Sequence, residues 1–438
     1  MNLVTVREHA RLTTGPLSEI SLDEATIPAT TFDWLCHETQ RYRAGDASLV
    51  QVDDRRWLRL DNYVGVIEAP DGTRIEILPK HTNELADTIT ARKILYRMLH
   101  ECLRLPTKDA GLTSLQTFKT PVSEWIIQRF LVELDALVRK GLRFDYRLVE
   151  EELRFLRGRL LVSRQIRQPV GRQHLFQVEH QVFDVNRVEN RLIRTALDKV
   201  AEMTRDAENW RLAHKLGHQL SGIEHSTDVA GDFRRWSSDR LMQHYSIIRT
   251  WCELILGDRS PLSTLGGWRG RSLLFPMEKV FERFVESSLR KRLPRGARVR
   301  TQAASEWLCY TSTRRVFQLR PDFVIEYNDS TWVVDAKWKL LDSTNVDDKY
   351  GLAQNDFYQL FAYGHRYLGG RGRMALIYPR TTRFSRPLET FHFDDGLSLD
   401  VISLDLETGD WQGSCLPVPG MDARDEIAGG TAEAALAM

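Results

Sequence analysis

The sequence lacks the features of several large protein classes. Its five cysteines, at positions 36, 102, 252, 309 and 415, include no Cys-x-x-Cys pair. An odd, scattered set argues against a disulfide framework or a structural zinc site and fits a reducing cytoplasm. No apolar run approaches the roughly 18 residues that a membrane-spanning helix needs. The N-terminus shows no basic start followed by an apolar core, so we expect no signal peptide, a cytoplasmic location and no membrane partner.

Two more absences concern nucleotides and bases. The chain has no G-x-x-x-x-G-K-[S/T] phosphate loop, so we expect it to bind no nucleotide by itself. It also has no zinc finger or other recognisable base-reading motif.

The net charge of +1 hides an uneven distribution. Residues 271–320 hold twelve Lys or Arg and four Glu, a balance of 12 − 4 = +8, whereas residues 401–438 hold seven Asp or Glu and one Arg. Each run, taken alone, could be a solvated surface. A basic segment that leads directly into a carboxylate cluster could also hold phosphates close to a metal site.

The length of 438 residues and the local patterns predict an α+β protein with several domains. Residues 1–84 are expected to form a mostly β N-terminal domain, and residues 85–265 a helical or mixed middle region. Breakers between Ser260 and Gly270 mark the next boundary. Residues 266–412 are then expected to form a C-terminal α/β domain, and residues 413–438 a disordered tail.

Within these domains, several elements can be located. The turn signal Pro70-Asp71-Gly72-Thr73 lies between two strand-like segments and predicts a hairpin. Apolar residues follow helical spacing over 89–103, over 125–137 and again through 186–256. The basic stretch 141–182 has a mixed pattern, and its arginines could serve DNA or a protein partner equally.

The most informative segment is a second hairpin, predicted over residues 319–338. Both arms are rich in β-branched and aromatic residues, and Asn328-Asp329 is a two-residue turn that pairs Tyr327 with Ser330. Counting outward places Asp322 opposite Asp335, because 322 + 335 equals 327 + 330. Directly opposed residues have Cβ atoms roughly 5 Å apart. Lys337 lies two residues beyond Asp335 and therefore on the same face.

Two carboxylates and an ammonium at one point suit phosphodiester hydrolysis. A hard cation such as Mg²⁺ (or Mn²⁺) takes oxygen ligands, polarises a phosphate and lowers the pKa of a bound water. Lys337 could orient that water and stabilise the charge that develops in the transition state. The alternative is a cross-strand salt bridge on an exposed hairpin face, and spacing alone does not choose between the two.

Two helices flank this hairpin. The first begins near Pro276 and carries Glu278 and Glu282 one turn apart, where either carboxylate could lean toward the site or simply face solvent. The second, after the hairpin, places Gln359 and Tyr363 on one face. The Gln359 amide and the Tyr363 hydroxyl could instead be core groups whose hydrogen bonds are satisfied.

In this order the motifs resemble the RecB-like form of the PD-(D/E)xK nuclease superfamily. The matching parts are Phe281-Glu282, Pro321-Asp322, Asp335-Ala336-Lys337 and the helix with Gln359 and Tyr363. The resemblance implies a metal-dependent endodeoxyribonuclease. Glu282, Asp322 and Asp335 would hold the metal, Lys337 would be the catalytic lysine, and Gln359 and Tyr363 would be supporting residues.

The rest of the chain resembles the McrC family, the endonuclease subunits of McrBC-type, 5-methylcytosine-dependent restriction systems. Segments that carry this resemblance are 62–67, 75–80, 156–160, Asp184 with Asn190-Arg191, and 376–379. It implies a McrB-like AAA+ partner ring that hydrolyses GTP and recognises modified cytosine in double-stranded DNA. It also implies that the McrC-like chain stimulates that GTPase, with its N-terminal and middle regions entering or capping the ring.

Two other functions stay open at this point. The chain could be a RecB-like repair or defence nuclease that works with a different motor, or none. It could also be an activator subunit in which the nuclease fold is retained without cleavage, although Asp322, Asp335 and Lys337 are all present.

Overall fold

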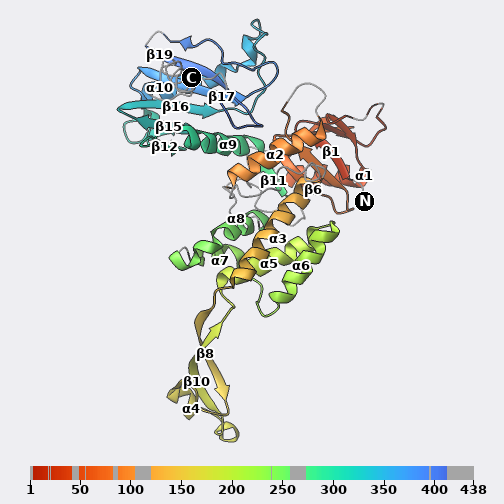
Figure 1. Ribbon diagram of the computed structural model, residues 1–438, viewed down its shortest axis with the longest axis vertical. Helices are drawn as coiled ribbons and strands as arrows, with labels where there is room; N and C mark the ends of the chain where they lie inside the picture. Colours follow the sequence, from red (N-terminus) through yellow and green to blue (C-terminus); the bar gives the residue numbers. More distant parts are fainter. Residues whose placement is uncertain are drawn as a thin grey trace, which may run out of the picture. The chain divides into compact units, whose positions relative to one another are not determined.

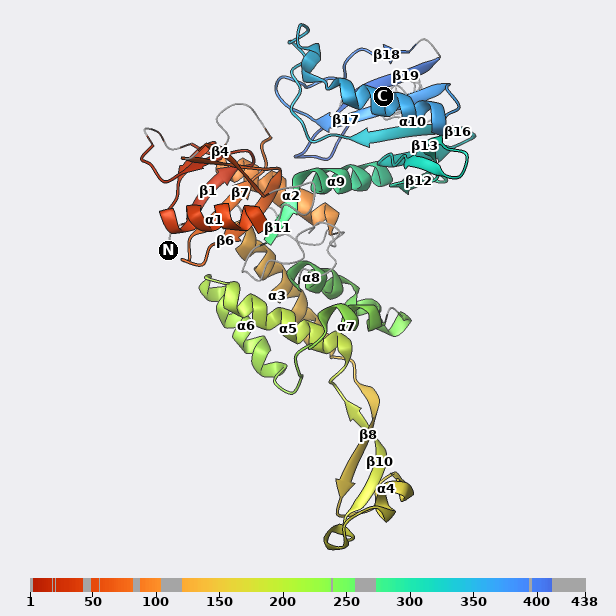
Figure 2. The ribbon, with the colours of Figure 1, turned by 180° about the vertical axis from the view of Figure 1, so that it is seen from behind.

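The computed structural model describes residues 3–17, 19, 21–41, 49–54, 56–81, 87–103, 120–237, 239–256, 273–393 and 396–411. The chain divides into two compact units, one made of Met1–Pro121 with Leu274–Met438 and one of Val122–Leu273 (Figures 1 and 2). The fold is mixed α/β with several sheets. In the part of the chain that the structure describes, no helix is long and apolar enough to cross a membrane. The predicted tail and the breaker-rich segment 260–270 lie outside the described residues.

Two four-stranded sheets, of orders β3-β2-β5-β4 and β1-β7-β6-β11, are formed by N-terminal residues together with one later strand, β11 (Leu273–Pro276). The predicted hairpin is confirmed as β6 and β7, which pair Gly65 with Ile77. Its turn contains Gly72 at φ +84°, a left-handed conformation that glycine adopts without steric cost. The strands are β1 (Leu3–Arg7), β2 (Arg11–Thr13), β3 (Glu24–Thr26), β4 (Val50–Asp54), β5 (Trp57–Leu60), β6 (Tyr63–Glu68) and β7 (Arg74–Leu78).

One N-terminal helix, α1 (Ala29–Arg41), was not predicted. Its first turn contains two threonines, which have low intrinsic helix propensity. The hydroxyls of Thr30 and Thr31 both donate hydrogen bonds to Asp71 Oδ2, at 2.5 and 2.6 Å. Tertiary contacts that the local pattern does not show therefore stabilise the start of this helix.

Strand β11 (Leu273–Pro276) joins the N-terminal sheet to the helix after it. It completes the sheet beside β6 and leads directly into α9 (Met277–Arg292). The amide of Met277 donates to the carbonyl of Asn62 at 3.0 Å, which fixes this junction. Helix α9 also packs against α2 (Thr88–Cys102), one of the helices that the apolar spacing predicted. The first and last thirds of the chain therefore share one unit.

A six-stranded sheet of order β12-β15-β16-β17-β19-β18 forms the C-terminal part. Strand β15 (Phe323–Tyr327) pairs antiparallel with β16 (Ser330–Ala336), and the predicted register of Tyr327 with Ser330 is confirmed. Asn328 and Asp329 have φ of +45° and +61°, as a type I′ turn requires. The other strands are β12 (Arg298–Thr301), β17 (Gly372–Pro379), β18 (Phe391–His392) and β19 (Leu397–Leu404).

Helix α10 (Gln354–Tyr367) packs against β16 and β17 (Figure 2). Its buried Leu360 and Tyr363 share a core with Met374 and Leu376 of β17. This packing determines which face of the helix meets the sheet. A separate two-stranded sheet, β13 (Trp307–Tyr310) with β14 (Arg315–Gln318), and the 3₁₀ turn η5 (Lys349–Gly351) complete the C-terminal part.

The second unit is a set of helices that carries an arm built on a three-stranded sheet of order β8-β10-β9. The helical spacing is confirmed as α3 (Val122–Lys140), α5 (Val188–Met203), α6 (Ala207–Gln219), α7 (Val229–Arg235) and α8 (Ser246–Leu256), with the 3₁₀ turn η4 (Arg240–Tyr245). The mixed stretch becomes the arm, in which β8 (Asp145–Leu153) pairs antiparallel with β10 (Phe176–Asp184) (Figure 1). Short elements lie at its far end: β9 (Arg159–Leu160), α4 (Val162–Ile166) and η3 (Val170–Arg172).

Gly158 allows β9 to approach β10. It has φ +70°, and a Cβ at this position would lie 2.4 Å from the Glu179 carbonyl oxygen and 2.6 Å from His180 Cβ. Any larger residue would therefore collide with β10 and would also be strained.

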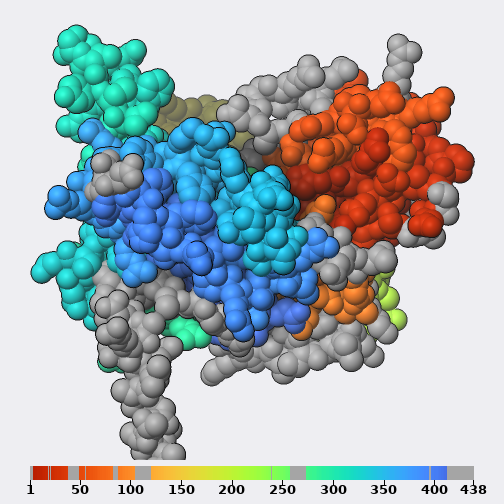
Figure 3. Space-filling model, turned by 90° about the horizontal axis from the view of Figure 1, so that it is seen from above, coloured from red at the N-terminus to blue at the C-terminus, as the bar shows by residue number. Residues whose placement is uncertain are grey.

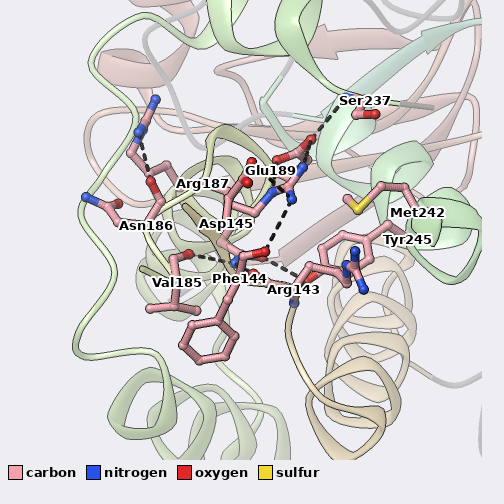
Figure 4. A network of polar contacts seen from close by, with 12 residues as sticks. Arg143, Phe144, Asp145, Val185, Asn186, Arg187, Glu189, Ser237, Met242 and Tyr245 are labelled. Atoms are coloured by element: carbon pink, nitrogen blue, oxygen red, sulfur yellow. Dashed lines mark hydrogen bonds and ion pairs between the residues drawn. The ribbon is translucent and has the colours of Figure 1, made fainter. Parts of the chain in front are cut away.

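The base of the arm is held by Asn190 at the start of α5, within the network that Figure 4 shows around Arg143, Val185 and Tyr245. Its side-chain amide donates to the carbonyls of Arg143, at 2.9 Å, and Val185, at 2.7 Å, one from each strand end. Its Oδ1 accepts a hydrogen bond from the Tyr245 hydroxyl at 2.9 Å. Beside it, the guanidinium of Arg187 bonds the buried Glu189. One buried amide thus ties both strands of the arm to the helices.

We expect Asn190→Ala to lower the free energy of unfolding by about 3 kcal/mol, because two carbonyls and a hydroxyl lose buried partners. Urea unfolding followed by circular dichroism measures this loss. The matched control is Asn186→Ala in the same network, since the Asn186 side chain accepts only a 3.3 Å bond from the Glu224 amide. Equal losses in the two variants would contradict the role given to Asn190.

Candidate active site

The two predicted aspartates lie at the open end of the β15–β16 hairpin. Asp322 immediately precedes β15, and its Oδ2 accepts a hydrogen bond from the Ala336 amide at 2.9 Å. Asp335 lies in β16 between β15 and β17 and is buried, with 2% of its surface exposed. The hairpin therefore brings both carboxylates to one end of the sheet, as the register predicted.

Lys337 points to the same place from the residues that follow β16. Its Nζ lies 2.8 Å from Asp335 Oδ2 and donates to Gln359 Oε1 at 3.0 Å. The Gln359 amide in turn donates to the Tyr363 hydroxyl at 2.7 Å. The structure thus gathers Asp335, Lys337, Gln359 and Tyr363 into one chain of contacts. The Lys337–Asp335 ion pair exists, but at a buried aspartate and not on the exposed face that the salt-bridge alternative assumes.

Of the two candidate glutamates on α9, Glu278 and Glu282, the second belongs to this cluster. The Gln302 amide donates to both Glu282 Oε1, at 2.6 Å, and Asp322 Oδ1, at 2.9 Å. The other carboxylate oxygen of Glu282 accepts from Lys279 Nζ at 2.6 Å. Glu278, one turn earlier, is exposed. A side-chain amide therefore bridges the helix carboxylate to the first aspartate.

Two of these contacts come from residues that the sequence reasoning missed. Gln302 follows β12 in a loop without periodicity, so nothing local identified it. Asp356 lies 3.6 Å from Lys337 Nζ and accepts a hydrogen bond from the Tyr378 hydroxyl. It precedes Gln359 by three residues on α10, and the same helical spacing that selected Gln359 and Tyr363 could have found it.

The electrostatics of the cluster follow from its burial. Burial, and then the nearby carboxylates of Asp335 and Glu282, raise the pKa of Asp322 well above its ordinary value. Burial raises the pKa of Asp335, although the Lys337 ammonium opposes this. For Lys337, burial acts to lower the pKa, but Asp335, Asp356 and Asp322 outweigh it and raise the pKa. The lysine therefore stays charged while the carboxylates repel one another.

Such a donor set fits a divalent cation. Carboxylate oxygens are the ligands of Mg²⁺ and Mn²⁺. Burial, and then the repulsion from Asp335 and Glu282, raise the pKa of Asp322, and a cation would offset both effects. In the described part of the chain, no three acidic, His or Cys side chains meet closely enough to hold an ion as they stand. The amide of Gln302, between Glu282 and Asp322, occupies the position where their oxygens would converge.

A further carboxyl, Glu8, reaches the back of the site from the N-terminal sheet. Its Oε1 accepts hydrogen bonds from Trp338 Nε1 at 2.7 Å and the Lys80 amide at 2.6 Å. The Trp338 ring, directly after Lys337, also contacts Phe281, with ring centroids 5.3 Å apart. Burial dominates at Glu8 and raises its pKa to about 7. Nothing in the local sequence pairs residues 8 and 338.

Together the sheet, its flanking helices and the partly buried acidic cluster define a mixed α/β protein with a charged centre at a hairpin end. Residues 58–379 match the family described as McrBC 5-methylcytosine restriction system component, and the chain belongs to this family. No curated protein matches the chain.

Two solved structures from Thermococcus gammatolerans share its fold. One is a half-complex from the tetradecameric assembly of McrB AAA+ hexamers with bound McrC, with a TM-score of 0.67 and 21% identity over 94% of this chain and 97% of that chain. The other is the McrBC complex, with a TM-score of 0.50 and 24% identity over 66% of this chain and 88% of that chain.

The raised pKa of Glu8 predicts that the free energy of unfolding depends on pH, and that Glu8→Gln removes this dependence. The folded pKa of about 7 exceeds the ordinary value of 4.5, so the stability due to the protonated carboxyl is lost as pH rises through 7. The stability of the variant relative to the native chain should therefore increase by about 3 kcal/mol between pH 4.5 and pH 8. Urea unfolding at several pH values measures it. The exposed control Glu389→Gln should show no trend, and a flat difference for Glu8→Gln would disprove the buried titration.

Proposed function

We propose that this chain is the DNA-cleaving subunit of a McrBC-like, modification-dependent restriction complex. Its C-terminal part would act as a PD-(D/E)xK endodeoxyribonuclease that hydrolyses phosphodiesters of double-stranded DNA. The observation that carries this proposal is the cluster of Asp322, Asp335 and Lys337 at one hairpin end. Glu282 and Gln359 approach it from two helices.

The residues of the cluster divide the chemistry among them. Asp322, Asp335 and Glu282 would hold Mg²⁺ (or Mn²⁺), which when bound polarises the phosphate and acidifies a water. Lys337, whose pKa is raised, remains an ammonium that can orient the attacking water and stabilise negative charge on the phosphate oxygens. Gln359 accepts from Lys337 Nζ and is itself held by Tyr363, so the two fix the direction of the lysine.

The partner in this proposal is a McrB-like AAA+ ring. Both Thermococcus neighbours are structures of McrB–McrC assemblies. This chain has no phosphate loop, so GTP hydrolysis would belong to the partner, and this chain would stimulate it. Recognition of modified cytosine would also lie with the partner.

The arm of the second unit supports contact with such a partner. It exposes large apolar side chains that a free surface rarely gathers in one segment. They are Tyr146, Leu148, Phe155, Leu156, Val162, Ile166, Val170 and Phe183. We assign this arm to the middle region that binds the ring.

Asp335→Ala should reduce DNA cutting by the complex roughly 1,000-fold or more, because a lost metal ligand removes several kcal/mol of transition-state stabilisation. Cleavage of methylated plasmid with the AAA+ partner and GTP measures this. Partner binding and GTPase stimulation should stay intact, since Asp335 is buried in the C-terminal sheet.

The matched control is Asp347→Ala, an exposed aspartate of the same part of the chain. Cutting that survives Asp335→Ala would show that the site is misassigned. A native chain that stimulates the GTPase but cuts no DNA would favour the activator alternative. Cutting without any GTP-hydrolysing partner would favour a RecB-like nuclease.

A further inference from the structure

The connection between β12 and β15 is a hairpin that starts and ends at the candidate active site. Gln302 and Asp322 are its two ends. The backbone N–H of Gln302 donates to the backbone carbonyl of Asp322 at 2.9 Å. Between them, β13 and β14 form their own antiparallel sheet. Strands β12 and β15 pair up to Thr301 and Phe323, so the hairpin leaves the six-stranded sheet beside the carboxylates.

Helix α10 contacts the base of this hairpin. Arg366 Nε donates to the Trp307 carbonyl at 2.6 Å, and the Tyr367 hydroxyl donates to the carbonyls of Ala303 and Leu319. These bonds clamp the base of the hairpin to the helix that carries Gln359. The hairpin is therefore fixed with respect to the catalytic cluster.

The hairpin also carries exposed apolar side chains. Leu308, Tyr310 and Phe317 are 47%, 76% and 71% exposed. The register pairs Tyr310 with Arg315 and Cys309 with Val316, so Leu308 and Tyr310 share one face of β13, and Phe317 lies across from Leu308 along β14. Phe317 has φ +59°, a strained conformation for an aromatic residue. Figure 3 shows this segment, in its green-blue colour, projecting from the blue part of the molecule.

The charge of the hairpin is positive. Residues 307–320 contain Arg314, Arg315 and Arg320 and no Asp or Glu. Among the described residues, Arg314 and Arg315 form no ion pair, and both are exposed. An unpaired basic tip beside an apolar face matches the phosphates and base edges of a nucleic acid.

We propose that the β13–β14 hairpin lies in a groove of the DNA duplex that flanks the bond to be cut. Arg314 and Arg315 would contact phosphates, and Leu308, Tyr310 and Phe317 would contact base edges or open a base step. This inference rests on the proposed nuclease function, because it takes the duplex at the carboxylate cluster as given.

Three observations favour DNA over a protein for this surface. A two-stranded ribbon fits the major groove, which is about 12 Å wide. Exposed apolar wedges with adjacent arginines are used by proteins that enter the minor groove. The attachment of both hairpin ends at Gln302 and Asp322 places the ribbon within about 30 Å, or one turn of DNA, of the cluster.

The test compares two hairpin variants of the full chain, Arg314→Gln/Arg315→Gln and Leu308→Ser/Tyr310→Ser/Phe317→Ser. Fluorescence anisotropy with a labelled duplex of about 30 base pairs, without divalent metal, gives affinity from roughly 50 to 200 mM salt. Each variant should bind about 10-fold more weakly. The slope of log affinity against log salt should fall by about 2 for the arginine variant only, because each phosphate contact contributes about 0.9.

The control is Arg240→Gln/Leu241→Ser, which removes an exposed arginine and an exposed leucine in the other unit. It should bind as the native chain does. In cleavage with the AAA+ partner, the hairpin variants should raise KM for DNA about 10-fold and leave kcat within about twofold. Circular dichroism melting of all variants verifies that they fold.

The outcomes separate this inference from the proposed function. If the native chain cuts and both hairpin variants keep its affinity, salt slope and KM, the hairpin does not bind DNA although the nuclease stands. If the variants lose association with the AAA+ partner or with a second copy but bind DNA normally, the surface belongs to a protein and the proposal is wrong. If the native complex cuts no DNA, the proposed function fails and this inference fails with it.

Discussion

The repulsion between the half-buried Asp322 and the buried Asp335 is the constraint on which the rest of this structure depends. Asp322 and Asp335 are brought to one hairpin end by backbone pairing that the core of the sheet determines. Like charges in this arrangement cost free energy unless cations or hydrogen-bond donors share them. The structure supplies Lys337 to Asp335, and the Ala336 amide and Gln302 to Asp322. Helices α9 and α10 are positioned where their side chains can complete this set of groups around the two aspartates.

Distant parts of the chain, which share one compact unit, support this site. Strand β11 extends the N-terminal sheet and continues into α9, which carries Glu282. Glu8 holds Trp338 from the other side, next to Lys337. The candidate site is therefore supported by residues from both ends of the sequence. Glu8, Trp338 and Phe281 thus form a chain of contacts from the N-terminal sheet to the residue next to Lys337.

The local parts of this architecture were predictable from sequence. Strand alternation and the Asn328-Asp329 turn determine the hairpin register, and helical spacing places Gln359 beside Tyr363. Spacing left Glu278 and Glu282 equivalent, because only the fold shows which carboxylate faces Gln302. Gln302 and Glu8 act through contacts between segments far apart in sequence, which no local pattern encodes. Helix α1 was missed because tertiary hydrogen bonds stabilise its threonine-rich start. Tertiary hydrogen bonds, those of Asn190, likewise stabilise the arm.

The central claim is that the Asp322–Asp335 cluster is a cation site. It is tested most directly by thermal unfolding of the full chain with and without millimolar Mn²⁺, in the native protein and in Asp322→Asn. A ligand that binds only the folded state raises the melting temperature. The account predicts that Mn²⁺ raises it for the native chain and for Asp347→Asn but not for Asp322→Asn. Without metal, Asp322→Asn should be at least as stable as the native chain, because one repulsive charge is gone. An equal Mn²⁺ effect in all three proteins would contradict the account.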